Sequence, residues 1–155
     1  MKHDPLRTLQ TAEVNPELAA ELAAELGVGG RVRFVGAVQD SWGFLADLDV
    51  FLSCSDTEGL SNSIIEAMAA GKAVIASAVG GTPELVEPGV TGYLYEARDV
   101  GTLSGLLCRV VKDAAHRTSL GAAAASFADR RLGLPALLEA HAALYARLGA
   151  GPAGG

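Results

Sequence analysis

The sequence predicts an α/β fold in which a parallel sheet is covered by helices on both faces. Two observations support this prediction. Short, continuously apolar runs alternate with segments of helical periodicity along most of the chain. Glycine or proline lies at many of the junctions between the apolar runs and the helical segments. Sheets of this kind bind ligands beyond the carboxyl ends of their strands, so the loops that follow the apolar runs are the first places to look for a site.

The N-terminal elements are a helix and a strand. The Leu18, Leu22 and Leu26 stripe predicts a helix over residues 16–26, with Asn15 as N-cap. Gly27 is the expected stop of this helix, and Pro16 takes its first position. The alternation in "RVRFVG" (31–36), followed by further turn residues, predicts a strand.

The remaining elements follow in regular alternation. "SWGFLADL" reads as a short helix, "VFLSCS" and "AVIAS" as buried strands, and "GYLY" as a last short strand. Thr82 is the expected N-cap of a helix with Pro83 at its first position. In order, we expect helices at 41–48, 62–70, 99–112, 114–129 and 135–148, a loop leading into a helix at 80–86, and strands at 50–55, 73–77 and 92–95. Residues 1–15 should be irregular, 16–148 should form the domain, and 149–155 should be a flexible tail.

Composition limits the class of protein. The chain has 155 residues, 50% of them hydrophobic and 19% charged, which suits one domain with a real core rather than a disordered chain. Its net charge is −6 without a cluster of lysine and arginine, so a nucleic-acid or anionic-membrane surface is disfavoured. We find no signal peptide and no apolar run long enough for a membrane span, and therefore expect a soluble cytoplasmic protein.

The two cysteines do not suggest a disulfide framework or a metal cluster. Neither Cys54 nor Cys108 has a second cysteine or a histidine at ligand spacing. We expect both to be small buried apolar residues.

The stretch "DTEGLSNSIIEAMAAGKAVIAS" (56–77) carries the candidate site. Its loop, residues 59–62, runs into the start of a helix, where free backbone N–H groups and the positive end of the dipole favour an anion such as a phosphate. Gly59 allows a ligand to approach the backbone closely. Glu66, about one turn into the helix, is suited to accept two hydrogen bonds from the vicinal hydroxyls of a ribose. Glu58 could bind the hydroxyls of a sugar at the other end of a diphosphate.

Spacing alone leaves a purely structural alternative open. Ser63 and Glu66 have the spacing of a capping box, in which Glu66 would only accept a bond from a backbone N–H. Glu58 could equally be a solvated loop acid.

The sequence resembles a known family in the same region. "EGLSNSIIEAMAAGKAVIASAVGGTPELV", with "RVRFVGAVQDSWGFLADLDVFLSCSDT" before it and "EPGVTGYLY" after it, closely resembles the C-terminal, donor-binding half of retaining two-domain glycosyltransferases of the B type. The pattern of two glutamates separated by seven residues, followed by A-M-A-x-G and G-G-x-P-E-L, is specific in combination. The resemblance implies a Rossmann-like domain and extends from about residue 16 to residue 148.

The resemblance also implies roles for individual residues. Glu58 would lie beside the donor sugar and Glu66 would bind the nucleotide ribose. The loop containing Val35 and Gly36 would approach the base. Backbone groups at five positions would line the sugar and diphosphate: Gly59, Leu60, Ser61, Asn62 and Ser63. The implied reaction is transfer of a hexose from a UDP- or GDP-sugar with retention of configuration, without a cofactor.

The family pattern is incomplete in this sequence. The family's domain begins with two further strands that carry an Arg and a Lys for the diphosphate, and the chain begins downstream of both and of the acceptor domain. Because preorganised cations stabilise a leaving diphosphate strongly, we expect weak donor binding and little catalysis by this chain alone. Either the strands at 31–36 and 50–55 pair directly, or a partner fills the gap between them.

Two alternatives to a truncated transferase follow. The chain could be a nucleotide-sugar-binding subunit completed by a separate acceptor-domain chain, or an interaction module without catalysis. The last helix, 135–148, is apolar almost all round and should favour self-association or a partner chain.

Several polar residues are discounted as site residues. The "DLD" at 47–49 resembles a divalent-cation pattern, but its place before a buried strand suggests that Asp49 ends a helix. His3, His116 and His141 lie far from the site in sequence and have no visible partner for acid–base chemistry. Arg117 is expected to be a solvated helix charge.

Overall fold

The computed structural model describes residues 16–149. The chain divides into two compact units, and the boundary along the sequence falls between Asp40 and Ser41. Each unit is described by itself below. The N-terminal stretch 1–15, with the expected cap Asn15, and the tail 150–155 lie outside the described residues.

The N-terminal unit contains the first expected helix, α1 (Pro16–Glu25). The chain leaves α1 through Gly27 at a φ of +67°, a conformation that glycine adopts without strain, and the Val28 N–H donates to the Ala23 carbonyl at 2.9 Å. Ala23 is buried, whereas Leu26 of the predicted stripe is 67% exposed. The helix is confirmed, and its apolar face is shorter than predicted.

The strand predicted at 31–36 is wrong for this structure. A single 3-10 turn, η2 (Gly29–Arg31), precedes an extended stretch that pairs with no strand within the described part of the chain. Val32 has strand-like backbone angles (φ −109°, ψ 132°), and Phe34 is 48% exposed. Alternating side chains favour an extended backbone, but a strand needs a neighbour for its N–H and C=O groups. Direct pairing with residues 50–55 was one of two alternatives, and it required a strand at 31–36 that the structure does not contain.

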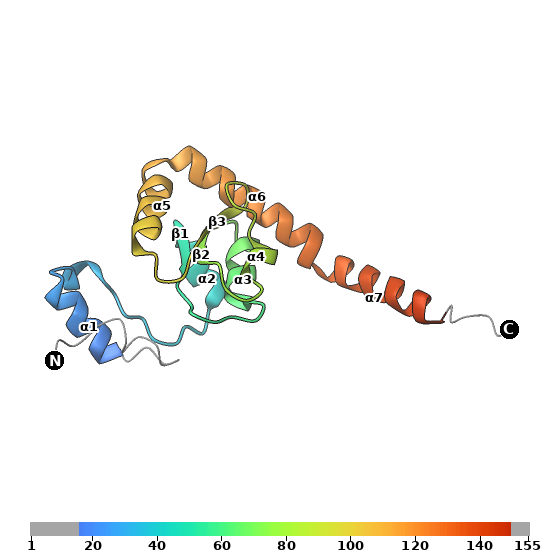
Figure 1. The fold of residues 1–155 in the computed structure, drawn as a ribbon, viewed down its shortest axis with the longest axis horizontal. Helices are drawn as coiled ribbons and strands as arrows, with labels where there is room; N and C mark the ends of the chain where they lie inside the picture. Colours follow the sequence, from blue (N-terminus) through green and yellow to red (C-terminus); the bar gives the residue numbers. More distant parts are fainter. Residues whose placement is uncertain (1–15, 150–155) are drawn as a thin grey trace. The chain divides into compact units, whose positions relative to one another are not determined.

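The C-terminal unit is built on a parallel sheet of three strands in the order β1-β2-β3. The strands are β1 (Val50–Ser53), β2 (Ala73–Ser77) and β3 (Gly92–Tyr95). Phe51 is in register with Val74, and Ile75 with Tyr93. All five residues of β2 are buried, as expected of a central strand covered on both faces. The predicted α/β class with a Rossmann-like arrangement is thus confirmed (Figure 1).

Helices connect the strands and cover the sheet. Each predicted helix of this unit is present, with α2 ending two residues early and α6 extending three residues further than predicted. The helices are α2 (Ser41–Ala46), α3 (Asn62–Ala69), α4 (Thr82–Leu85), α5 (Val100–Lys112), α6 (Ala114–Leu132) and α7 (Leu134–Gly149). No helix among residues 16–149 has the length and apolarity that crossing a membrane would need.

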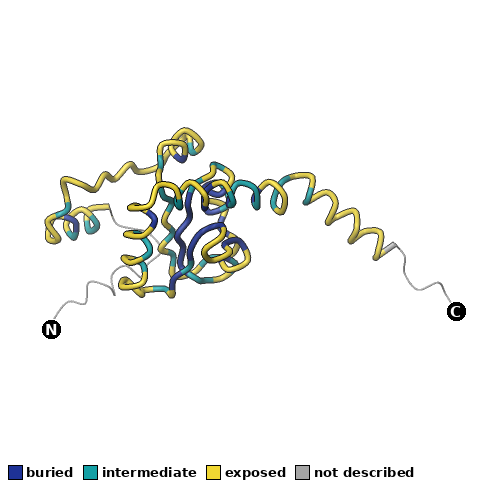
Figure 2. Tube along the Cα trace, turned by 90° about the horizontal axis from the view of Figure 1, so that it is seen from above, coloured by how far each residue is buried: buried dark blue, intermediate teal, exposed yellow. Residues whose placement is uncertain are grey.

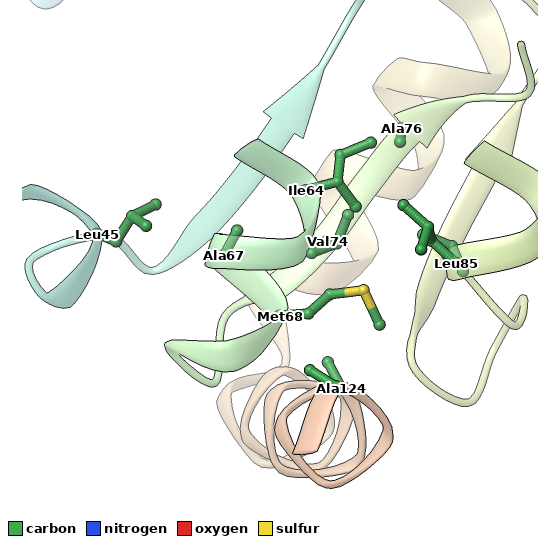
Figure 3. Packing of buried hydrophobic residues seen from close by; sticks show 10 residues of the cluster. Leu45, Ile64, Ala67, Met68, Val74, Ala76, Leu85 and Ala124 are labelled. Carbon is green, nitrogen blue, oxygen red and sulfur yellow. The ribbon is translucent and has the colours of Figure 1, made fainter. Parts of the chain in front are cut away.

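Two hydrophobic clusters lie on the two faces of the sheet. Val74 and Ala76 of β2 pack with Ile64 and Met68 of α3 and Ala124 of α6 (Figure 3). The alternate β2 residues pack on the other face, in a cluster formed by Ala73, Ile75, Tyr93, Tyr95, Val110 and Leu120. The period of two along β2 therefore divides its side chains between two layers of helix, which holds the strand ends in fixed positions.

The turn between α3 and β2 shows how closely α6 approaches the sheet. Gly71 has a φ of +70° and ends α3, as predicted, while the Lys72 N–H donates to the Ala67 carbonyl at 3.0 Å. A Cβ at Gly121 of α6 would lie 2.0 Å from the Gly71 oxygen. Gly121 is therefore needed for this close approach, whereas Gly71 is needed for its positive φ.

Helix α7 exposes most of its apolar residues. Figure 2 colours nearly all of α7 as exposed. The exposed large side chains are Leu134, Leu137, Leu138, Leu144, Tyr145 and Leu148. The predicted apolar surface is present on α7.

Two local predictions are wrong. Cys54 and Cys108 are exposed rather than buried. Cys54 follows the edge strand β1, and Cys108 falls outside the inward-facing stripe of α5, which includes Leu103, Leu107 and Val110.

The second wrong prediction concerns the cap of α4. Gly81 is the N-cap, and Thr82 is the first helical residue with Pro83 after it. The Thr82 N–H donates to the Val79 carbonyl at 3.0 Å, so the turn before the helix already satisfies this donor.

Candidate functional site

The candidate site lies beyond the carboxyl ends of β1 and β2. The connection at 54–61, called the acidic loop below, follows β1, carries Glu58, and leads into the N-terminus of α3. The connection at 78–81 follows β2 and leads into α4. Parallel strands bring both loops to the same edge of the sheet, as the sequence predicted.

A pair of glycines lets the two loops touch. The Gly81 N–H donates to the Gly59 carbonyl at 2.9 Å. Gly80 has a φ of +54°, and a Cβ there would lie 1.7 Å from the Glu58 carbonyl oxygen. Any side chain at residue 80 would therefore displace the backbone that carries Glu58. The sequence indicated a turn at these glycines but not this backbone contact.

Hydroxyl groups at the strand ends fix the Glu58 side chain. The Ser55 hydroxyl donates to Glu58 Oε1 at 2.7 Å. The Ser77 hydroxyl donates to the Ser55 carbonyl at 2.6 Å, so the last residue of β2 holds the residue that orients Glu58. Sequence reasoning missed both serines. Their signal was a small hydroxyl residue at the end of each of two neighbouring apolar strands.

The start of α3 does not form the capping box that the spacing of Ser63 and Glu66 allowed. Ser61 is the N-cap, makes no side-chain capping bond, and its hydroxyl lies 3.0 Å from the Ser63 hydroxyl. Ser63 is inside the helix and therefore cannot be the N-cap that pairs with Glu66. Within residues 16–149, no side-chain hydrogen bond or ion pair engages the half-buried Glu66 carboxylate.

The remaining predicted site residues are placed as follows. Gly59, Leu60 and Asn62 are exposed, and a Cβ added at Gly59 would meet nothing within 4 Å. Gly59 therefore faces open space, as a residue that admits a ligand must. Val35 and Gly36 belong to the N-terminal unit, where Val35 is 47% exposed and Gly36 has a φ of +62°. Their approach to a base stays a prediction.

The third strand contributes two further groups at this edge. The Tyr95 hydroxyl donates to the Ser53 carbonyl at 3.3 Å, and burial, followed by its hydrogen bond with Cys54, raises the Tyr95 pKa. Arg98, just after β3, forms an ion pair with Asp56 of the acidic loop at 3.1 Å. Neither residue was predicted, because a tyrosine in a strand and an arginine in a turn carry no signal of their own.

The discounted residues lie elsewhere. Asp49 pairs with Arg117 of α6 at 3.2 Å, at the amino-terminal edge of the sheet, and no three potential ligands gather around a metal position within the described residues. Arg117 also donates to the carbonyls of Val110 and Val111, so the prediction of a purely solvated charge is wrong. The His116 Nε2 lies 2.9 Å from the Tyr93 hydroxyl, a structural partner that sequence did not reveal.

With this geometry established, comparison with known proteins identifies the type of domain. The profile of the family described as Glycosyl transferases group 1 matches residues 9–113. The lipopolysaccharide core biosynthesis glycosyltransferase LpsE of Rhizobium meliloti is 36% identical over 100 residues, which make up 64% of this chain and 29% of that protein. A GDP-mannose-dependent mannosyltransferase acting on a monoacylated phosphatidylinositol monomannoside, from Corynebacterium glutamicum, is 39% identical over 105 residues, 62% of this chain and 27% of its own length.

Solved structures agree on the fold. The Anabaena protein HepE, crystallised in complex with UDP, superposes with a TM-score of 0.78 at 27% identity, covering 85% of this chain and 37% of HepE. HepE has also been crystallised with UDP-glucose. The chain thus spans between a quarter and two fifths of the length of each of these proteins.

Proposed function

This chain belongs to the group 1 family of glycosyl transferases, and we propose that residues 41–149 form the donor-binding part of a hexosyltransferase that uses a nucleoside diphosphate sugar. The observation that carries the proposal is the arrangement around the acidic loop. The Ser55 hydroxyl holds Glu58, Gly59 faces open space, and Ser61, two residues later, is the N-cap of α3.

Each end of the donor would find a matching group. The N-terminal amides of α3 would donate to the diphosphate, because the first N–H groups of a helix lack intrahelical partners and the dipole there is positive. Glu66, without a protein partner within the described residues, would accept hydrogen bonds from the ribose hydroxyls. Glu58 would accept from the sugar hydroxyls and position the sugar rather than attack it.

The proposal extends to stereochemistry and cellular location. Transfer would proceed with retention of anomeric configuration, by a front-side route in which the donor phosphate helps to deprotonate the acceptor. The donor is a UDP- or a GDP-sugar, since relatives of both kinds share the fold. No bound cofactor is part of the proposal. A cytoplasmic location is part of it, and fractionation of the producing cells tests that point.

Calorimetric titration with nucleotides tests donor binding. We expect saturable heats with UDP and UDP-glucose, or with GDP and GDP-mannose, and the responding pair identifies the base. Glu66→Ala should abolish these heats if Glu66 binds the ribose, whereas Glu139→Ala on exposed α7 is the matched control and should leave them unchanged. A folded protein that gives no heat with any of the four nucleotides would refute the proposal.

A second candidate function rests on two surfaces of the C-terminal unit that could bind another chain. β1 is an edge strand of the described sheet, and the apolar residues of α7 are exposed. We propose as the alternative that this chain is a nucleotide-sugar-binding subunit, completed by self-association or by a separate acceptor-domain chain. Alone, it would then bind a donor weakly and turn over little of it. Light scattering after gel filtration tests self-association, and a monomer at high concentration would leave only the separate chain.

A further inference from the structure

Arg98 adopts a backbone conformation that arginine normally avoids. Its φ is +71°, and it is the only non-glycine residue with a positive φ among residues 16–149. Side chains with a Cβ are strained in this region because the Cβ approaches the following carbonyl. The other described positions with a positive φ are all glycine: Gly27, Gly36, Gly71, Gly80 and Gly89. A glycine at position 98 would fit this turn without strain.

The arginine side chain reaches from this turn to the acidic loop. Arg98 Nη2 lies 3.1 Å from Asp56 Oδ2, and Arg98 Nε lies 3.4 Å from Asp56 Oδ1, so the guanidinium faces the carboxylate with two donors. The side chains are 56% and 41% exposed, respectively. An ion pair this exposed to solvent contributes little to the free energy of folding. The stability contributed by this ion pair is therefore a weak reason to keep arginine in a strained turn.

The position of Asp56 in the acidic loop suggests why arginine occurs at residue 98. Asp56 lies two residues before Glu58. The Ser77 hydroxyl and the Gly81 N–H donate hydrogen bonds to backbone carbonyls of the acidic loop. Those contacts anchor the acidic loop to β2. The pair with Arg98 anchors the same loop to the connection between β3 and α5, on the other side of β2.

We propose that Arg98 is a positioning residue for the donor site. Through Asp56 it holds the acidic loop, and with it Glu58, in the conformation that receives the nucleoside diphosphate sugar. Strained backbone at a functional site is commonly maintained for such preorganisation. The proposal rests on the proposed function for its ligand, but the ordering of the loop can be measured without any ligand.

The first test is hydrogen exchange of the ligand-free full chain. In Arg98→Gly, backbone amides of residues 54–61 should exchange about two- to fivefold faster than in the wild type, the range expected from losing one exposed ion pair. Because glycine relieves the strain, the thermal midpoint should stay the same or rise. Arg147→Ala on α7 removes an equal charge from an exposed helix and should leave exchange in the loop unchanged. Unchanged loop exchange in Arg98→Gly would overturn the proposal.

The second test links the loop to the donor. UDP-glucose, or GDP-mannose if the chain prefers guanine, should bind about two- to fivefold more weakly to Arg98→Gly at unchanged stability. The double variant Asp56→Arg/Arg98→Asp restores the ion pair, and aspartate tolerates a positive φ better than most residues. It should therefore restore both affinity and loop protection.

The outcomes separate this proposal from the donor-binding proposal. Loop protection restored without restored affinity would mean that Arg98 contacts the ligand itself, which overturns a positioning role. A fall in thermal midpoint that parallels the loss of affinity would indicate a merely structural residue and would also overturn it. A wild type that binds no nucleotide sugar refutes the proposed function alone, because loop exchange still decides whether Arg98 orders the acidic loop.

Discussion

Gly80→Ala is the substitution that most directly tests the construction of the site. The new methyl carbon would lie 1.7 Å from the Glu58 carbonyl oxygen, and the backbone φ of +54° is itself unfavourable for alanine. The positive φ costs about 1–2 kcal/mol. Moving the acidic loop away from the methyl group costs about 1–3 kcal/mol, typical of overpacking. We therefore expect a loss of roughly 2–5 kcal/mol in the free energy of unfolding.

Thermal and chemical denaturation measure this loss, and titration with UDP-glucose or GDP-mannose measures its effect on the site. The thermal midpoint should fall by roughly 5–15 °C for a domain of this size. Donor binding should weaken as well, because the displaced oxygen belongs to Glu58. Gly105→Ala in α5 is the control, since a Cβ there meets nothing within 4 Å and a helical alanine should stabilise the protein slightly. Wild-type stability and affinity in Gly80→Ala would refute the contact between the two loops.

Three further predictions follow. Gly59→Ala should leave stability unchanged or slightly higher, because its Cβ would meet nothing within 4 Å. It should weaken donor binding if the ligand approaches this backbone. Unaltered affinity would place the donor elsewhere. The raised pKa of Tyr95 favours the neutral phenol in the folded state. Its contribution to stability is therefore complete below about pH 10 and is lost as the pH rises further. Unfolding curves of wild type and Tyr95→Phe should differ in this alkaline range. Hydrogen bonds from Thr102 lower the pKa of Asp99, the N-cap of α5. The contribution of Asp99 to stability is therefore present above pH 3.8 and is lost as the pH falls further. Asp99→Ala should remove this acid dependence of stability, whereas Asp99→Asn should retain much of the helix cap.

The sequence predicted those elements that are determined by local pattern and by burial together. Strand β2 is apolar throughout and buried throughout, and Gly71 ends α3 where expected. The strand predicted at 31–36 failed because alternation of side chains specifies an extended backbone but does not supply a pairing partner. The predicted burial of Cys54 failed for a related reason, because the residue follows a strand at the edge of the sheet.

The sequence predicted the two glutamates of the candidate site, but it did not predict the residues that hold the acidic loop in place. Glu58 and Glu66 stand out because their spacing belongs to a specific pattern, and the structure removed the capping-box alternative by starting α3 at Asn62. Ser77 and Arg98 act across the sheet, on residues far away in sequence. Contacts of this kind depend on the register of neighbouring strands, which no single segment of sequence encodes.

The charges at the site bear on how a diphosphate could be held. Glu58 and Glu66 are carboxylates, and the guanidinium of Arg98 already faces Asp56, so its charge is largely compensated. The α3 N-terminus offers backbone donors and about half a positive charge, which suits one phosphate oxygen better than a complete diphosphate. The neighbouring acids oppose the remaining phosphate charge, an effect that salt screens only in part at such short range. Under the proposed function, the carboxylates at this edge of the sheet would favour the hydroxyls of the ribose and the sugar, and tight binding of the diphosphate would need cations besides Arg98.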